Sequence, residues 1–207
     1  MAEWPITSSL DLFIGPFIKL KVIQKTMSPG KRVELKMGGN MTIEEAIKTA
    51  IEFEIKIRDI YSEAADAVDD EVGKRIFKTL SDDEQHHVDY LNSKLEQLQE
   101  TGTITVERLD SAIPSQKIIK QQADQVKSLA VKDFHGIKQQ MLSKALKAEI
   151  ETSEFYQRMA NELSAEGQAM FKRFLEIENN HIDAVQFELD YLGKTGYWFD
   201  FKEFDME

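Results

Sequence analysis

The sequence predicts an all-α protein, a four-helix bundle with one long crossover between its second and third helices, preceded by an N-terminal arm over 1–40. The first observation is that none of the four prolines falls within 41–99 or 137–193. The second is that both stretches are rich in Ala, Leu, Ile, Glu, Lys and Gln, which favour helices. The third is that each stretch has room for two helices, while 100–137 is long enough to connect two distant helices.

The arm over 1–40 differs in composition, because it holds three of the prolines. Residues 17–23 and 31–36 alternate apolar with polar side chains and could form strands around a turn at Ser28-Pro29-Gly30. An extended arm fits these residues equally well. Gly38-Gly39-Asn40 is the expected hinge into the bundle, which we expect to occupy 41–193.

The first hairpin of the bundle begins at Thr42. Thr42 is a plausible N-cap because Glu45, three residues later, completes a capping box. We expect the first helix over about 42–68. Asp69-Asp70 then breaks this helix and helps to start a second one over about 71–99, which Thr101-Gly102 ends.

The second hairpin follows the crossover, which contains a shorter amphipathic segment near 115–132. We expect the third helix over about 138–163 and the fourth over about 166–193. Gly193 is the expected C-cap of the fourth helix. The aromatic and acidic tail over 194–207 is expected to pack back onto the bundle or to form a dimer contact.

Composition excludes several classes of protein. The 207 residues carry 26 Lys and Arg against 37 Asp and Glu, and this net charge of −11 argues against a general nucleic-acid binder. Cysteine is absent, which excludes disulfides, thiolate catalysis and thiolate-bound metal centres within this chain. No apolar run is long enough to span a membrane, and no secretory signal is visible at the N-terminus, so we expect a cytoplasmic location.

The two predicted hairpins repeat each other. Glu54 and Tyr61 in the first helix correspond to Glu149 and Tyr156 in the third, 95 residues later. The second and fourth helices each carry a Glu-x-x-His motif, and these motifs lie 94 residues apart. All six Glu and His positions interrupt apolar stripes that otherwise face a core. Isolated buried carboxylates are costly, so these groups must pair, become protonated or bind cations.

Residues three apart on a helix share a face, so the Glu and His of each motif can converge on one point. One Glu on each of two helices and one Glu-x-x-His on each of the other two is the ligand set of dinuclear iron and manganese carboxylate proteins. Four carboxylates also neutralise two divalent cations. Iron fits these ligands, and so do manganese and zinc. The predicted metal ligands are Glu54, Glu84, His87, Glu149, Glu178 and His181.

The symmetry of the repeat suggests that Glu84 and Glu178 bridge the two metals. Glu54 with His87, and Glu149 with His181, would then be terminal ligands, although the sequence leaves open which His joins which Glu. Tyr61 and Tyr156 could orient ligand carboxylates through hydrogen bonds, or they could be core tyrosines whose hydroxyls bond elsewhere.

At these residues the chain resembles the rubrerythrin branch of the ferritin-like family, over about 42–99 and 137–193. The resemblance implies a ferritin-like fold and a non-haem di-iron centre that reduces hydrogen peroxide in defence against oxidative stress. It also implies a homodimer. Rubrerythrins typically carry an additional carboxylate where this chain has Thr152. They also have a Cys₄ electron-transfer domain, which a chain without cysteine cannot form, so the reductant must be external.

Other readings share the same ligands. A ferritin-like protein that oxidises, stores or delivers iron would use dioxygen and the same residues, and a di-manganese catalase is a further option. A metal-free bundle whose buried polar groups merely pair is the structural alternative. We read His86 as a surface or supporting residue, Glu151 as a solvated charge and Glu154 as mainly solvated. His135 lies in an expected loop, and its position supports no functional assignment.

Overall fold

The computed structural model describes residues 11–13, 19–21, 41–114, 117–119 and 136–199. The chain divides into two units, 1–38 and 39–207. In the first unit, β1 (Asp11–Phe13) pairs antiparallel with β2 (Lys19–Lys21), with Leu12 opposite Leu20. Strand β2 lies inside the strand predicted over 17–23, but it pairs with β1. The other predicted strand, over 31–36, and the predicted turn at 28–30 lie outside the described residues.

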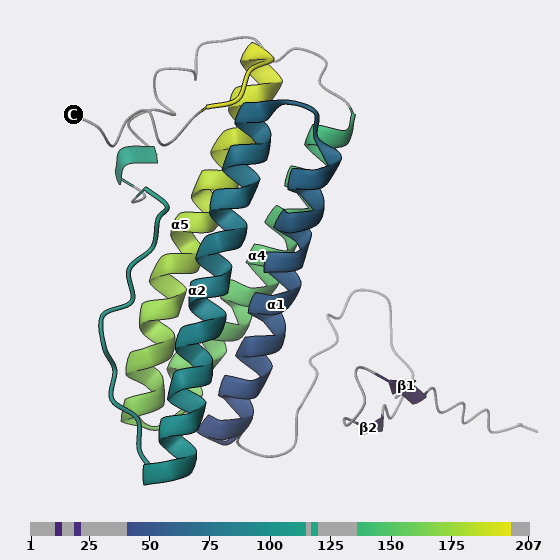
Figure 1. Ribbon diagram of the computed structural model, residues 1–207. Helices are drawn as coiled ribbons and strands as arrows, with labels where there is room; N and C mark the ends of the chain where they lie inside the picture. Colours follow the sequence, from purple (N-terminus) through teal and green to yellow (C-terminus); the bar gives the residue numbers. More distant parts are fainter. Residues whose placement is uncertain (1–10, 14–18, 22–40, 115–116, 120–135, 200–207) are drawn as a thin grey trace, which may run out of the picture. The chain divides into compact units, whose positions relative to one another are not determined.

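The second unit is a four-helix bundle, which confirms the predicted fold class (Figure 1). Its helices are α1 (Ile43–Ala67), α2 (Glu71–Thr101), α4 (Ile137–Glu162) and α5 (Ala165–Thr195). Helices α1 and α4 lie side by side and run antiparallel. Lys56 on α1 therefore pairs with Glu151 on α4, whereas Glu63, further along α1, pairs with the earlier residue Lys144.

The helix ends follow their capping chemistry. The Thr42 hydroxyl accepts from the backbone N–H of Glu45, whose carboxylate accepts from the backbone N–H of Thr42 in return. Asp70 caps α2, and Gly102 ends it in the left-handed conformation, at φ 76°.

The predicted end of the fourth helix is wrong. Gly193 is helical and buried, and α5 continues to Thr195. The left-handed residue is Gly196, at φ 82°, whose N–H donates to the carbonyl of Leu192. A glycine inside a helix costs only about 1 kcal/mol relative to alanine, so Gly193 need not end the helix when a second glycine follows.

Two apolar clusters fill the bundle, one on each side of a polar layer. On every helix the predicted Glu and His residues lie between residues of one cluster and residues of the other. The first cluster includes Ile57, Leu80, Leu142 and Val185, and the second includes Ile47, Leu91, Tyr156 and Phe174. The polar layer is therefore sealed along the bundle axis in both directions.

The described part of the crossover lies along α2 and α5 (Figure 1). It packs through four buried side chains, those of Ile104, Leu109, Ile113 and Ile119. The Arg173 guanidinium on α5 donates to the backbone carbonyl of Leu109 at 2.7 Å. Of the amphipathic segment predicted near 115–132, only 117–119 is described, and it is helical. These contacts hold the crossover against both helices.

The described part of the tail packs onto the bundle. The Trp198 ring is buried and contacts Phe77 edge to face, with ring centroids 5.5 Å apart. Gly73 on α2 leaves the space that this ring occupies, because a Cβ there would lie 2.6 Å from it. Among the described residues, we find no helix with the length and apolar character needed to cross a membrane.

Candidate metal centre

The structure brings all six predicted Glu and His side chains together at the middle of the bundle. Each of the four helices contributes: α1 provides Glu54, α4 provides Glu149, and α2 and α5 each provide one Glu-x-x-His motif. All six side chains are fully buried, at 0% exposure. They belong to two overlapping groups whose ligand atoms lie within 4.8 Å of one another. The first group is Glu54, Glu84, His87 and Glu178, and the second is Glu84, Glu149 and His181.

Glu84 is the residue that the two groups share. Its Oε2 lies 2.9 Å from His87 Nδ1, and its Oε1 lies 2.8 Å from His181 Nδ1. One carboxylate thus faces both imidazoles, one oxygen to each. This is the geometry that a carboxylate bridging two cations needs.

The remaining carboxylates divide between the two histidines. Glu54 Oε2 lies 3.2 Å from His87 Nδ1, whereas Glu149 Oε1 lies 3.7 Å from His181 Nδ1. These are the pairs that the repeat suggested. Glu178 Oε1 lies 3.8 Å from His87 Nδ1, and Glu178 belongs to the first group alone. Its bridging role therefore stays a prediction.

The two tyrosines bind the carboxylates crosswise. The Tyr61 hydroxyl on α1 donates to Glu149 on α4, and the Tyr156 hydroxyl on α4 donates to Glu54 on α1. Burial, followed by the charges of Glu149 and Glu54 respectively, raises the pKa of each hydroxyl well above its ordinary value. Each tyrosine therefore stays protonated and orients the carboxylate of the opposite hairpin.

Burial and mutual repulsion divide the carboxylates into two kinds. Burial, and then the charge of Glu84, raises the pKa of Glu54 to about 8. Burial, with Glu54 and Glu149, raises the pKa of Glu178 well above its ordinary value. Burial also acts on Glu84, but the two imidazoles outweigh it and hold the pKa of Glu84 well below its usual range.

The histidines complement this pattern. Burial alone would lower the pKa of His87, but Glu84 and Glu54 outweigh burial and raise it to about 10. Glu84 and Asp83 likewise raise the pKa of His181 well above its ordinary value. Without cations, protons on the imidazoles thus balance part of the carboxylate charge. A cation that binds here must displace those protons.

Unsatisfied polar atoms indicate that the centre fits cations. Both carboxylate oxygens of Glu178, Oε2 of Glu149 and Nδ1 of His181 have no hydrogen-bond partner among the described residues. His181 Nδ1 lies close to Glu84 Oε1, yet the two atoms do not form a hydrogen bond. Buried polar atoms are rarely left in this state. Carboxylate oxygens and imidazole nitrogens are suitable ligands for iron, manganese or zinc.

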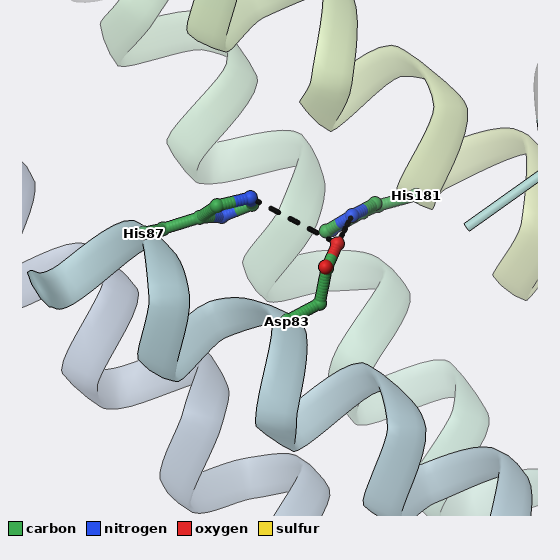
Figure 2. A group of neighbouring side chains, drawn as sticks. All are labelled: Asp83, His87 and His181. Atoms are coloured by element: carbon green, nitrogen blue, oxygen red, sulfur yellow. Dashed lines mark hydrogen bonds and ion pairs between the residues drawn. The ribbon is translucent and has the colours of Figure 1, made fainter. Parts of the chain in front are cut away.

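Sequence reasoning missed one buried carboxylate, that of Asp83. It is 1% exposed, and its carboxylate is directed toward both imidazoles (Figure 2). Asp83 faces the Nε2 atoms of the two rings, whereas Glu84 faces their Nδ1 atoms. The crossover residue Ser111 was missed with it and donates to Asp83 Oδ2 at 2.6 Å. The spacing of Asp83 and His87, four residues apart on one helix, was the available signal.

The other residues considered from the sequence lie outside the centre or beyond the described residues. His86 and Glu154 are exposed, and Glu151 pairs with Lys56. Thr152 is buried, and its hydroxyl donates to the backbone carbonyl of Ala148 on its own helix. His135 lies outside the described residues.

The sequence was compared with known protein families, curated proteins and solved structures. The family model described as Rubrerythrin matches residues 45–188, which is more than half of the chain. The chain belongs to the rubrerythrin family. The match includes all six Glu and His residues and both tyrosines, and membership of this family implies a di-iron centre. No curated protein and no solved structure matches the chain significantly.

Proposed function

We propose that this rubrerythrin-family protein holds two iron ions and reduces hydrogen peroxide to water, as a cytoplasmic defence against oxidative stress. The observation that carries the proposal is the pair of fully buried ligand groups that share Glu84. A single cation would not require two such groups. The proposed ligands are Glu54, Glu84, His87, Glu149, Glu178 and His181.

In this proposal the metals carry out the redox chemistry, and the protein fixes the ligands and excludes water. The two iron ions, when bound, supply the two electrons that convert one H₂O₂ and two protons into two H₂O. Glu54 and Glu149 are held by Tyr156 and Tyr61, so the second oxygen of each carboxylate keeps a fixed orientation. The apolar clusters on either side exclude bulk water, which strengthens the electrostatic interactions inside the centre.

The electrons must be restored from outside the chain. A sequence without cysteine has no thiolate-bound iron centre of its own, so we propose a separate electron donor. We also propose a homodimer, as the family resemblance implies.

The test is to load the protein anaerobically with two Fe(II) per chain and to mix it rapidly with H₂O₂ or with O₂. We expect oxidation by peroxide to be much faster than oxidation by O₂, and to turn over when a reductant is added. Oxidation no faster than that of free Fe(II) would contradict the proposal. Faster oxidation by O₂ would favour the iron-oxidising alternative, and activity with Mn(II) alone would favour a catalase.

A matched pair of variants on α4 links the activity to the centre. Glu149→Gln removes a proposed ligand, whereas Glu151→Gln makes the same change two residues away at a side chain paired with Lys56. We expect the Glu149→Gln variant to lose the iron proposed for the group of Glu84, Glu149 and His181, and with it the peroxide reaction. Glu151→Gln should retain both, and equal loss in the two variants would contradict the assignment.

A further inference from the structure

Asp83 is a buried carboxylate that the proposed function does not use. Its Oδ2 lies 3.0 Å from His181 Nε2 and 3.9 Å from His87 Nε2. Figure 2 shows the carboxylate directed toward both rings, and the rings lie nearly parallel, with an interplanar angle of 15°. Asp83 thus forms a hydrogen bond with His181 and a longer ion-pair contact with His87, whose Nε2 has no hydrogen-bond partner among the described residues.

The two imidazoles are oriented in the same way. Nδ1 of both rings faces the proposed ligand carboxylates, and Nε2 of both rings faces Asp83. A nitrogen that binds a metal must offer a lone pair, so the ring proton must then reside on Nε2. A carboxylate acceptor at Nε2 favours this tautomer and fixes the plane of the ring.

The crossover holds Asp83 in place. Ser111 Oγ donates to Oδ2 at 2.6 Å, and the backbone N–H of Ala112 donates to Oδ1 at 2.9 Å. Ser111 Oγ also lies 3.4 Å from His181 Nε2. The position of Asp83 therefore depends on the crossover, a segment outside the four helices. Arg173 in turn binds this segment to α5.

We propose that Asp83 is a positioning residue that favours the Nε2–H tautomer of both rings, through a hydrogen bond to His181 and through its charge at His87. We further propose that the crossover at Ser111 and Ala112 sets the position of Asp83. The inference rests on the proposed metal centre, because it assigns Nδ1 of both rings to metal binding. It implies that the crossover helps to position the ligands of that centre. It also implies that one carboxylate, that of Asp83, affects both metal positions through the two imidazoles. The competing reading is that Asp83 and the two Nε2 atoms themselves hold a cation.

The test is Asp83→Asn, which preserves the shape of the side chain and removes its charge. Asp83 accepts from Ala112 at one oxygen and from Ser111 and His181 at the other. An amide has only one acceptor oxygen. In Asp83→Asn the NH₂ group must therefore face either the N–H of Ala112 or the donors of Ser111 and His181, and the hydrogen bonds on that side are lost. Glu188→Gln is the matched control, because Glu188 is a fully buried carboxylate that accepts from the backbone N–H of Phe199 in the tail.

Two measurements on the full chain separate positioning from general stability. Co(II) competition titrations give the affinity of each site, and ¹⁵N spectra of the imidazoles in the Zn(II)-loaded protein give the tautomers. We expect Asp83→Asn to weaken both Co(II) sites about 10- to 100-fold and to lose or shift the Nε2–H signals of both rings. Ser111→Ala, which keeps the carboxylate, should have a smaller effect. Glu188→Gln should lower the unfolding temperature of the metal-free protein without changing either measurement.

Three results would overturn the inference. The first is unchanged Co(II) affinity and tautomers in Asp83→Asn. The second is a loss of affinity that Glu188→Gln reproduces. The third is a wild-type stoichiometry of three Co(II) that falls to two in Asp83→Asn, which would make Asp83 a ligand. Neither measurement uses peroxide, so failure of the proposed reaction would leave the inference standing, and failure of the inference would leave the reaction untouched.

Discussion

The stability of the metal-free protein should fall as the pH rises, and Glu54→Gln should remove part of this fall. Glu54 is fully buried beside Glu84, and its pKa in the folded state is about 8, against 4.5 for an unperturbed glutamate. Below pH 4.5 both the folded and the unfolded chain hold the Glu54 proton. Between pH 4.5 and 8 the unfolded chain releases it and the folded chain keeps it, so the free energy of unfolding decreases.

The size of the effect follows from the two pKa values. Their difference corresponds to about 5 kcal/mol at most between pH 4.5 and 8. His87 adds a decrease in the same direction, because its pKa is raised to about 10 and its stabilising contribution is lost as the pH rises from 6.5 to 10. Glutamine fits at position 54, because its carbonyl can still accept from Tyr156.

The assay is denaturant unfolding in the presence of a chelator, at intervals between pH 5 and 8. We expect Glu54→Gln to equal the wild type near pH 5 and to exceed its free energy of unfolding by several kcal/mol at pH 8. Glu52→Gln is the control, because it changes an exposed carboxylate on the same helix. A variant curve parallel to that of the wild type would refute the reasoning, and so would a wild-type stability that rises over this range.

Three further predictions concern single contacts. Tyr156→Phe should weaken Co(II) binding about 10- to 100-fold in competition titrations, because the proposed ligand Glu54 loses its hydrogen-bond donor. Unchanged affinity would count against this role of Tyr156. Gly73→Ala should push the Trp198 ring aside and lower the free energy of unfolding by about 1–3 kcal/mol, despite the better helix propensity of alanine. In a Trp4→Phe background the fluorescence should shift to longer wavelength, and an unshifted spectrum would contradict the displacement. Thr42→Ala should lower the free energy of unfolding by about 1 kcal/mol in denaturant titrations, whereas an unchanged midpoint would show that the cap is dispensable.

Two of these predictions have matched controls. Tyr90→Phe removes a tyrosine hydroxyl that donates to the backbone of the crossover, and it should leave Co(II) affinity unchanged. Ser93→Ala removes a hydroxyl in the interior of α2, where it serves no cap. It should therefore cost less stability than Thr42→Ala.

Sequence periodicity predicted the helices and the gathering of the six Glu and His residues, because both depend on local spacing. The starts of α1 and α2 follow from the Thr42 and Asp70 caps, whose contacts lie within three residues. The end of α5 did not follow, because Gly193 and Gly196 offer the same local signal and only one adopts the left-handed conformation.

The features that the sequence could not predict depend on contacts between elements. Each tyrosine shares a helix face with the glutamate seven residues before it, but the sequence left open which carboxylate its hydroxyl contacts. Because α1 and α4 run antiparallel, that step along one helix reaches the glutamate of the other. The contact of Asp83 with His181 likewise joins residues 98 positions apart, and no local pattern encodes it.

The crossed tyrosines make the interface between the two hairpins self-complementary. Glu and Tyr of one hairpin meet Tyr and Glu of the other, as they do in an isologous contact between two identical subunits. A single hairpin therefore cannot orient its own glutamate, but two copies of one hairpin could exchange the same pair of hydrogen bonds. The internal repeat thus resembles a homodimer joined into one chain. The carboxylates of Glu54 and Glu149 reach their final orientation only when the two hairpins have docked.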